Sequence, residues 1–371
     1  MTEIHEISAL REHVRTHGSL KHTVLQNIDL TEARIDWAGL EIEDTTFLGC
    51  KLTLDDEVAL RRRGAYLYFP PRDVPYNPYR RDLYTWRELM DGWTAERDAS
   101  YDLHIYEHFR QTRHNPPINA AMLQRIHDHN MDEGIRNLVE FDDRGMTRRR
   151  CVGIMGGHST RRDDPFYTLT ARTAFRLAQT DYLVVSGGGP GTMEAANLGA
   201  YFGDKTETEL LDAIRDLQRA PHYADAGFHQ RAFEVLERYP VGAPSLAIPT
   251  WFYGHEPSNL FATHIAKYFS NSLREDMLLA VCLYGIVYAP GSAGTTQEIF
   301  QDATQNHYGT FDYYSPMVFL GEKRYAIDTL LYPLLRQLSY GRRYHELLHL
   351  TDEPDEVVRF IQQHPPIHVG G

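Results

Sequence analysis

The sequence predicts an α/β protein with a Rossmann-like, doubly wound and mostly parallel sheet, preceded by an irregular or β-helical N-terminal appendage. From residue 150 onward, short runs rich in β-branched residues alternate with helical segments, as in repeated βα units. Two glycine-rich loops follow such runs directly, and each opens a helix. The chain has 371 residues, more than the roughly 250–300 at which a single core stops growing. We therefore expect more than one structural part.

The βα units can be assigned in order along residues 150–371. Apolar, β-branched runs predict strands at 151–155, 182–187, 245–249, 285–292, 316–320 and 346–351. Segments with apolar residues on one face predict helices at 168–179, 191–202, 261–269, 295–305, 329–338 and 355–363. Ligands of such sheets bind beyond the carboxyl ends of the strands, where the strand order reverses. The loops after VVSG and VYAPG are therefore the first place to look for chemistry.

The first 149 residues divide into two stretches. Residues 1–115 contain Pro- and aromatic-rich segments such as YLYFPPRDVPYNPY, which predict an appendage made largely of loops. Residues 116–149 predict a helical connector, because apolar residues recur there with helical periodicity. The α/β domain is then expected to span 150–371.

Apolar residues recur at every fifth position near residues 18–52 of the appendage. They are Leu20, Leu25, Leu30, Ile35 and Leu40. Ala33 and Ala38 precede the last two by two positions. This spacing resembles the pentapeptide-repeat β-helix, in which the central apolar residue and a small residue two positions earlier point inward. A few ordinary strands and turns are the alternative, and so short a coil would need the rest of the chain to bury its core.

The acidic composition limits the expected partners. The chain has 38 Lys and Arg residues against 51 Asp and Glu residues, a net charge of −13, whereas binding to nucleic acid or an anionic membrane requires a basic face. No apolar run approaches the ~20 residues that span a bilayer, and the N-terminus lacks the pattern of a secretory signal. Cys50, Cys151 and Cys282 are far apart, so we expect no disulfide framework, no metal site and no cofactor, in a cytoplasmic protein.

The two glycine-rich loops carry the strongest functional signal. The first runs from Ser186 to Glu194 and the second from Pro290 to Glu298. Glycines directly after a strand let backbone N–H groups approach a phosphate, and the N-terminus of the following helix adds partial positive charge. Neither loop has the GxxxxGK(S/T) pattern of P-loop ATPases. Neither has GxGxxG followed by an acidic residue at the next strand end, so NAD binding is a second choice.

Three segments together resemble one known family. MGGHSTRRDDPFY, SGGGPGTMEAANLGA and APGSAGTTQE resemble the LOG family, Rossmann-like phosphoribohydrolases named after the "Lonely guy" proteins and long mislabelled lysine decarboxylases. The first glycine loop also resembles bacterial nucleotide 5′-monophosphate nucleosidases. The family signature is PGGxGTxxE, and Ser292 replaces its second glycine. The resemblance covers about residues 150–330 and implies hydrolysis of the N-glycosidic bond of a nucleoside 5′-monophosphate, giving free base and ribose 5-phosphate.

The resemblance implies a catalytic pair. Glu298 would be the carboxylate that stabilises positive charge on the ribose ring or activates water, although a glutamate in the first turn of a helix also complements the helix dipole. Arg274 would complete the pair. In our alignment the family's arginine falls one residue later, at Glu275, and one residue turns a helical side chain by roughly 100°. Arg274 could therefore also be a surface charge.

The resemblance and the loop geometry also predict the binding residues. They are Gly157, Ser159, Gly188, Gly189, Gly191, Thr192, Glu194, Pro290, Gly291, Ser292, Gly294 and Thr295. Ser159 would lie near the phosphate, and Glu194 would hydrogen-bond ribose hydroxyls unless it only complements its helix dipole. Thr192 could be only an N-cap. Trp251 or Phe252 could stack on the base or pack in the core.

The expected partner is a nucleoside monophosphate or a related phosphorylated small molecule, and the resemblance implies a homo-oligomer. Lysine decarboxylation is disfavoured, because pyridoxal phosphate requires a Schiff-base lysine and only Lys267 lies near the motifs, inside an expected helix. A non-catalytic nucleotide sensor on the same fold is the rival function, since the displaced arginine and Ser292 both leave room for it. In a third interpretation the appendage is an interaction module.

Overall fold

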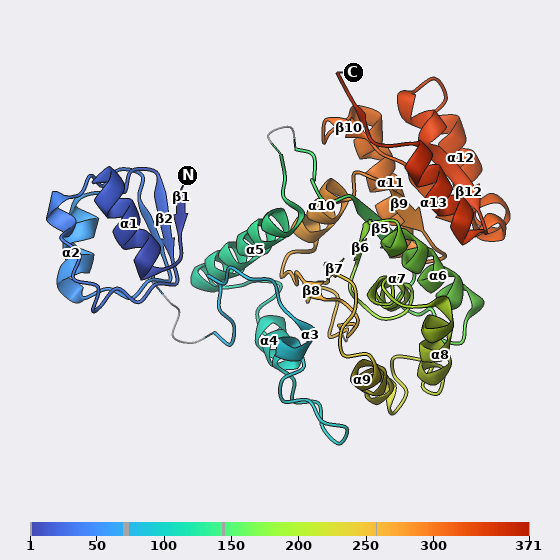
Figure 1. Ribbon diagram of the computed structural model, residues 1–371, viewed down its shortest axis with the longest axis horizontal. Coiled ribbons are helices and arrows are strands. Elements are labelled where there is room, and N and C mark those ends of the chain that lie inside the picture. The colour runs from blue at the N-terminus through green and yellow to red at the C-terminus, as the bar shows by residue number, and fades with distance from the viewer. Residues whose placement is uncertain (1, 70–73, 143–144, 257, 371) are drawn as a thin grey trace. The chain divides into compact units, whose positions relative to one another are not determined.

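The computed structural model describes residues 2–69, 74–142, 145–256 and 258–370 (Figure 1). The chain divides into two units: residues 1–81 with 118–130, and residues 82–117 with 131–371. These units differ from the three stretches expected from the sequence. Residues 82–117 belong with the α/β part, and helix α5 (Ile118–Val139) is divided between the two units.

The second unit is built on a seven-stranded sheet in which all paired strands are parallel, with the order β12-β11-β9-β5-β6-β7-β8. The strands are β5 (Cys151–Met155), β6 (Leu183–Ser186), β7 (Ser245–Ala247), β8 (His264–Ile265), β9 (Ile286–Tyr288), β11 (Met317–Leu320) and β12 (Leu348–Thr351). Strands β6, β7 and β8 extend the sheet on one side of β5, and β9, β11 and β12 extend it on the other. The strand order therefore reverses between β5 and β9, and the predicted doubly wound α/β class is confirmed.

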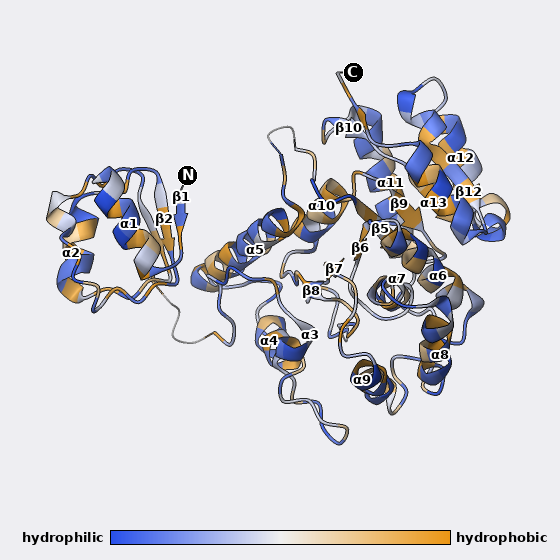
Figure 2. Ribbon diagram, in the orientation of Figure 1, coloured by the Kyte–Doolittle hydropathy of each residue, from blue (hydrophilic) through white to orange (hydrophobic). Residues whose placement is uncertain are grey.

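Side chains alternate between the two faces of this sheet. Val152 and Val287 belong to a buried cluster with helices α6 (Pro165–Gln179), α7 (Thr192–Tyr201) and α13 (Pro354–Gln363). The neighbouring residue of β9 points the other way. Its ring, that of Tyr288, stacks 5.4 Å from the ring of Phe319 on β11. Figure 2 shows hydrophobic residues along the central strands and hydrophilic ones on much of the outer surface of the helices.

The remaining elements of the second unit surround this core. The helices are α3 (Trp86–Leu89), α4 (Tyr101–Arg110), α8 (Glu207–Leu217), α9 (Phe228–Arg238), α10 (Asn271–Val281), α11 (Ala293–Tyr308) and α12 (Leu331–Leu338). A π-helical turn (Lys323–Asp328) and a 3-10 turn (Arg343–Leu347) flank α12. Strands β10 (Tyr313–Tyr314) and β13 (Ile367–His368) form a separate antiparallel pair. Local signals begin several of these helices, as in α8, where Thr206 and Glu209 form a reciprocal capping box.

One predicted helix is wrong. Residues 261–269 contain strand β8 instead, which pairs with β7. Nearly every side chain in this segment is buried, including Phe261, Ile265 and Tyr268. An apolar segment buried on several sides has no polar face, so periodicity alone does not distinguish a strand from a buried helix.

The first unit is a smaller parallel sheet with the order β1-β2-β3-β4. Its strands are β1 (Thr2–Ile4), β2 (Thr23–Gln26), β3 (Thr46–Leu48) and β4 (Tyr66–Tyr68). Helix α1 (Ile7–His17) connects β1 to β2, a short 3-10 turn (Trp37–Gly39) precedes β3, and α2 (Leu54–Arg62) connects β3 to β4. Each connection returns the chain to the same edge, so the strands stack as successive coils.

The coil length corrects the pentapeptide interpretation. Val24 pairs with Thr46, and the bridge from Ser19 to Glu41 has the same offset of 22 residues, whereas four pentapeptides make 20. Ala38, expected to point inward, is exposed, and Trp37 is buried. The residues that stack are Leu20, Thr23, Leu25, Ile28 and Leu30 on Ile42, Thr45, Phe47, Cys50 and Leu52. The positions that face this core therefore repeat every 22 residues.

Polar side chains inside this small core donate to neighbouring coils. The hydroxyl of Thr45 donates to the carbonyl oxygen of Leu20 at 2.7 Å, and the thiol of Cys50 donates to that of Leu25 at 3.3 Å. Burial raises the pKa of the Cys50 thiol to about 11, so the thiol keeps the proton that it donates.

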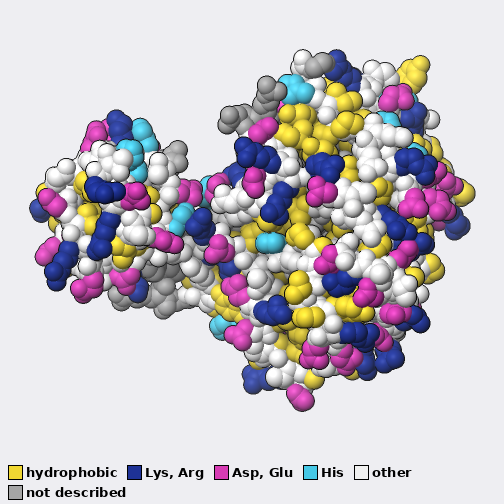
Figure 3. All heavy atoms as spheres, in the orientation of Figure 1, with side chains coloured by type: hydrophobic (Ala, Val, Ile, Leu, Met, Phe, Trp, Pro, Cys, Tyr) yellow, Lys and Arg dark blue, Asp and Glu magenta, His cyan; other side chains and the backbone are white. Residues whose placement is uncertain are grey.

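Charged side chains of both signs are interspersed on the face of the molecule drawn in Figure 3.

We predict that Gly199 is required for the packing of α7 on α6. A Cβ atom at this position would overlap the carbonyl oxygen of Ala171 and lie 2.9 Å from the Cβ of Ala174. Gly199→Ala should therefore lower the free energy of unfolding by about 1–3 kcal/mol, measured by urea denaturation followed by circular dichroism. Gly39→Ala is the control, because its Cβ would meet its nearest neighbour at 3.4 Å. Equal stability of the two variants would contradict the close packing.

Candidate active site

A pocket opens at the point where the strand order reverses. Segments after β5, β6, β7 and β9 line it together with helix α10, and its space of about 770 Å³ includes the open mouth. The lining residues are Gly156, Gly157, His158, Gly187, Gly188, Gly189, Met193, Pro249, Thr250, Tyr253, Glu256, Arg274, Glu275, Ser292, Gly294, Thr295 and Glu298. The structure therefore brings the two glycine loops to one cavity.

The first glycine loop is held against the segment after β5 by its backbone. The N–H of Thr192 donates to the carbonyl oxygen of Gly157 at 3.0 Å, and the hydroxyls of Thr192 and Thr160 are 3.1 Å apart. At Gly191, which has a φ of 70°, a Cβ atom would lie 2.6 Å from the carbonyl oxygen of His158. Gly191 and Thr192 thus join the two segments behind the pocket, whereas Gly187 to Gly189 and Met193 of this loop line it.

The second glycine loop presents the start of helix α11 to the pocket. Ser292 precedes the helix, but its side chain does not cap it, so first-turn N–H groups near Gly294 and Thr295 are available to a ligand. A Cβ atom at Gly294 would meet no atom within 4 Å. Pro290 and Gly291 lie behind this surface, where their carbonyl oxygens accept from the Gly157 N–H at 3.1 Å and from Arg324 at 2.6 Å.

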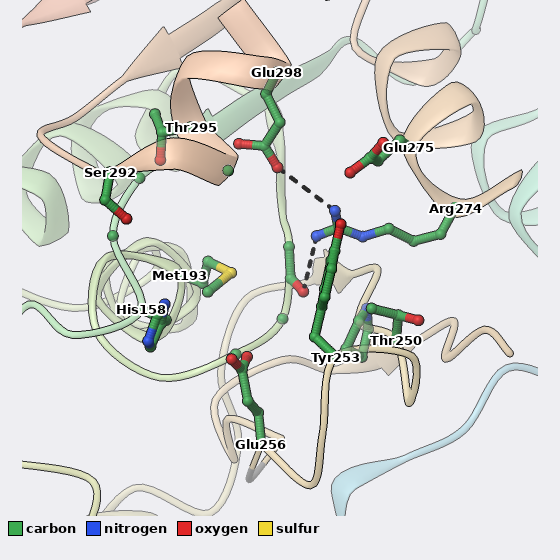
Figure 4. A pocket seen from close by; sticks show the side chains of 17 residues that line it. His158, Met193, Thr250, Tyr253, Glu256, Arg274, Glu275, Ser292, Thr295 and Glu298 are labelled. Carbon is green, nitrogen blue, oxygen red and sulfur yellow. Dashed lines mark hydrogen bonds and ion pairs between the residues drawn. The ribbon is translucent and has the colours of Figure 1, made fainter. Parts of the chain in front are cut away.

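Arg274 and Glu298 form an ion pair on the pocket wall (Figure 4), with 3.5 Å between Nη1 and Oε1. Nε of Arg274 donates to the carbonyl oxygen of Ile248 at 2.7 Å, and Nη2 donates to that of Gly187 at 3.4 Å. The guanidinium is therefore fixed by the ends of two strands. Glu275 lies beside it, and its carboxylate accepts hydrogen bonds from Asn271 and Gln297. Arg274 reaches Glu298 despite the one-residue offset in our alignment.

The environment of Glu298 raises its pKa to about 6. Burial is the largest cause, the Arg274 guanidinium opposes it by favouring the carboxylate, and the charge of Glu275 raises the pKa further. A carboxyl group that titrates near neutral pH suits proton transfer in a reaction at that pH.

Two further expected binding residues, in addition to Gly191, Thr192, Pro290 and Gly291, do not line the pocket. The carboxylate of Glu194 is 1% exposed and receives hydrogen bonds from Arg162 at 2.6 and 2.8 Å and from the Tyr167 hydroxyl at 2.8 Å. It has no free oxygen for a ribose, so that expectation is corrected. Ser159 is exposed and does not line the pocket, whereas the preceding residue, His158, does.

The loop after β7 supplies pocket residues that no motif indicated. Thr250, Tyr253 and Glu256 line the cavity. The two aromatic residues considered from the sequence do not, since Trp251 is fully buried and Phe252 is absent from the lining. The only available sequence signal was position, because every segment that follows a strand of a parallel sheet ends at the same edge.

A buried charge cluster anchors this loop to helix α4. Asp102 accepts a hydrogen bond from the indole of Trp251 at 2.8 Å and from the ammonium of Lys267 at 2.8 Å, and Lys267 also donates to Ser258 at 3.0 Å. Lys267 and Asp102 are 1% and 2% exposed. The backbone N–H of Asn259 donates to the carbonyl oxygen of Gly188 at 3.1 Å. Both ends of the loop are therefore fixed around Tyr253 and Glu256.

Comparisons with family models and with curated proteins found no match. Among solved structures, a Moco carrier protein from Chlamydomonas reinhardtii aligns with a TM-score of 0.38 and 14% identity, over 58% of this chain and 97% of that chain. A molybdenum cofactor binding protein from Rippkaea orientalis aligns with a TM-score of 0.36 and 13% identity, over 58% of this chain and 97% of that chain.

In the described part of the chain, no helix has the length and apolar character needed to cross a membrane.

We predict that the Asp102–Lys267 pair matters most when it is broken on one side only. Asp102→Asn leaves a buried ammonium without its counter-charge and should lower the free energy of unfolding by about 3–5 kcal/mol. Adding Lys267→Met should restore much of this loss, because the amide introduced by the first substitution can still accept from Trp251. Urea denaturation of both single variants and of the double variant measures the coupling free energy between the two side chains. Lys323→Met, at an exposed ion pair, is the control and should cost at most about 1 kcal/mol. Additive losses would contradict the coupling.

Proposed function

We propose that this protein hydrolyses the N-glycosidic bond of a nucleoside 5′-monophosphate to a free base and ribose 5-phosphate. The observation that carries the proposal is the Arg274–Glu298 pair, set in the wall of a pocket that both glycine loops enclose. The resemblance of these segments to the LOG phosphoribohydrolases supports the same reaction.

The phosphate would bind at the start of α11. Ser292, Gly294 and Thr295 face the pocket there, and an uncapped helix N-terminus favours an anion through its N–H groups and its dipole. Gly187 to Gly189, in the loop after β6, line the same pocket with backbone. This arrangement provides for an anionic group without any lysine.

In the proposed reaction the bond from C1′ to the base nitrogen breaks and both electrons leave with the base. Positive charge then develops on the ribose ring, and the Glu298 carboxylate would stabilise it. Water forms the new C1′–O bond and gives one proton to Glu298. The departing base takes up one proton from the solvent, and Glu298 returns its proton to the solvent, which regenerates the carboxylate. The products are the neutral base and ribose 5-phosphate. Arg274 would act by holding Glu298 in place and favouring its ionised form.

Incubation of the purified protein with a panel of nucleoside monophosphates tests the proposal. Release of free base and ribose 5-phosphate, resolved by chromatography, is the expected result. Tight binding of a nucleotide without release of any base would instead favour the nucleotide sensor on the same fold.

Glu298→Gln should reduce kcat by about 10²–10⁴-fold, because the amide can neither accept the proton nor carry negative charge. Binding of ribose 5-phosphate, measured by calorimetry, should change little, since the N-terminus of α11 is intact. Glu237→Gln, at an exposed position of α9, is the matched control. Unchanged turnover in Glu298→Gln would remove this residue from the mechanism.

The pH dependence of kcat should show an acid limb near pH 6. Glu298 must be ionised, so activity should fall as pH decreases through its pKa of about 6. Arg274→Gln should move the limb to higher pH, because the guanidinium lowers this pKa. The phosphate of the substrate also titrates near about 6, so ribose 5-phosphate binding to Glu298→Gln across the same range is the control. A limb at the ordinary value for Glu, near about 4.3, would contradict the prediction.

A further inference from the structure

We infer that Glu256 recognises the base of the nucleotide and selects guanine. The inference rests on the proposed function for the orientation of the ligand. It concerns one carboxylate in the pocket that the proposed reaction does not use.

Glu256 lies on the side of the pocket formed by the loop after β7, and Figure 4 shows it on the opposite side from Glu298. A Cβ atom built on Gly189 would lie 3.1 Å from Oε2 of Glu256. The carboxylate therefore lies close to the first glycine loop, and a side chain at Gly189 would crowd it.

The carboxylate of Glu256 has no hydrogen bond or ion pair to any other described residue of the pocket. The one guanidinium in the lining, that of Arg274, is engaged by Glu298, Ile248 and Gly187. Glu275 is likewise satisfied by Asn271 and Gln297. An ionised carboxylate offers about four acceptor positions, so Glu256 holds unused acceptors at the cavity surface, and a ligand with N–H groups can supply the donors.

The loop that carries Glu256 is fixed at both ends. Trp251 is bound to Asp102 at one end, and the N–H of Asn259 is bound to Gly188 at the other. Glu256 lies between these two anchors, five residues after Trp251 and three before Asn259.

The charges of the pocket orient the ligand. Ser292 and Thr295, at the start of α11, lie on one side in Figure 4, whereas Arg274, Tyr253 and Glu275 lie on the other. A phosphate is attracted to the helix N-terminus and repelled by Glu256. With the ribose beside Glu298, the base would lie toward Tyr253, whose ring offers an apolar face for stacking. Glu256, three residues further on the same loop, would then meet the edge of the base.

Guanine matches a free carboxylate better than the other common bases. Its N1–H and N2–H₂ groups are adjacent donors, and they can each donate to one carboxylate oxygen in a two-point, charge-assisted contact. Hypoxanthine has the N1–H but lacks the amino group. Adenine and cytosine each place a ring acceptor beside their amino group, and that acceptor would face the negative charge.

Guanosine and inosine 5′-monophosphate differ only by the amino group and form the matched substrate pair for the test. For the wild-type protein we expect kcat/KM to favour the guanine nucleotide by about 10–100-fold, the range of one hydrogen bond to a charged group. Glu256→Gln and Glu256→Ala should reduce the preference to within about threefold, through a higher KM for the guanine nucleotide. Glu256→Asp should retain part of it, and Glu237→Gln should retain all of it. Equal use of both substrates by the wild type, or an unchanged preference in Glu256→Gln, would overturn the inference.

Deoxyguanosine 5′-monophosphate tests contact with the ribose instead. If Glu256→Gln weakens both ribonucleotides equally and abolishes discrimination against the deoxynucleotide, Glu256 contacts the ribose and the assignment to the base fails. The dissociation constants of the same nucleotides, measured by calorimetry, separate this inference from the proposed function. A preference for guanine in binding that is lost in Glu256→Gln would support the inference even if no nucleotide is hydrolysed. Hydrolysis without any such preference would support the function alone.

Discussion

The pocket depends on direct contact between the backbones of three loops. The N–H of Gly157 donates to Pro290, and its carbonyl oxygen accepts from Thr192, so the segments after β5, β6 and β9 are joined through one residue. Gly191 permits this contact because a side chain there would collide with the carbonyl oxygens behind it. The parallel sheet brings these segments to the same edge, and the backbone contacts fix the spacing between them. Arg274 is then attached to the same framework through strand-end carbonyl oxygens.

The charged residues of the second unit serve two distinct purposes. Glu194 with Arg162, and Asp102 with Lys267, are buried pairs whose hydrogen-bonding capacity is directed inward. They fix the loops, because separating either pair would leave a charge in an apolar interior. Glu298 and Glu256 instead direct hydrogen-bond acceptors toward the cavity. The net charge of −13 does not reveal this division, nor does it count the partial charge of a helix N-terminus, which is the proposed partner of the phosphate.

Local signals were sufficient for some of these features and insufficient for others. The strands and both glycine loops could be predicted, because β-branched runs and glycines act over a few residues. The role of Glu194 could not, since its partner Arg162 is 32 residues away and the pairing exists only in three dimensions. Arg274 reaches Glu298 although the alignment offset pointed to Glu275. The loop after β7 carries no motif, because Trp251, Tyr253 and Glu256 acquire their roles from an aspartate in a segment that the sequence assigned to another part. In the first unit, the apolar residues follow a 22-residue coil whose period is set by the strand pairing.

The order in which the two units use the chain has a consequence for synthesis on the ribosome. The first unit needs residues 118–130 in addition to 1–81, and residues 82–117 between them belong to the second unit. The first unit is therefore incomplete until residue 130 has emerged from the ribosome. At that stage Asp102 has already been synthesised, but its partner Lys267 has not. Domains generally fold as units during synthesis, from the N-terminus onward. Residues 82–117, which belong to the second unit, are therefore synthesised before the first unit is complete and must wait for their later partners while it folds. For the same reason, cleavage of the chain at one position cannot separate the two units.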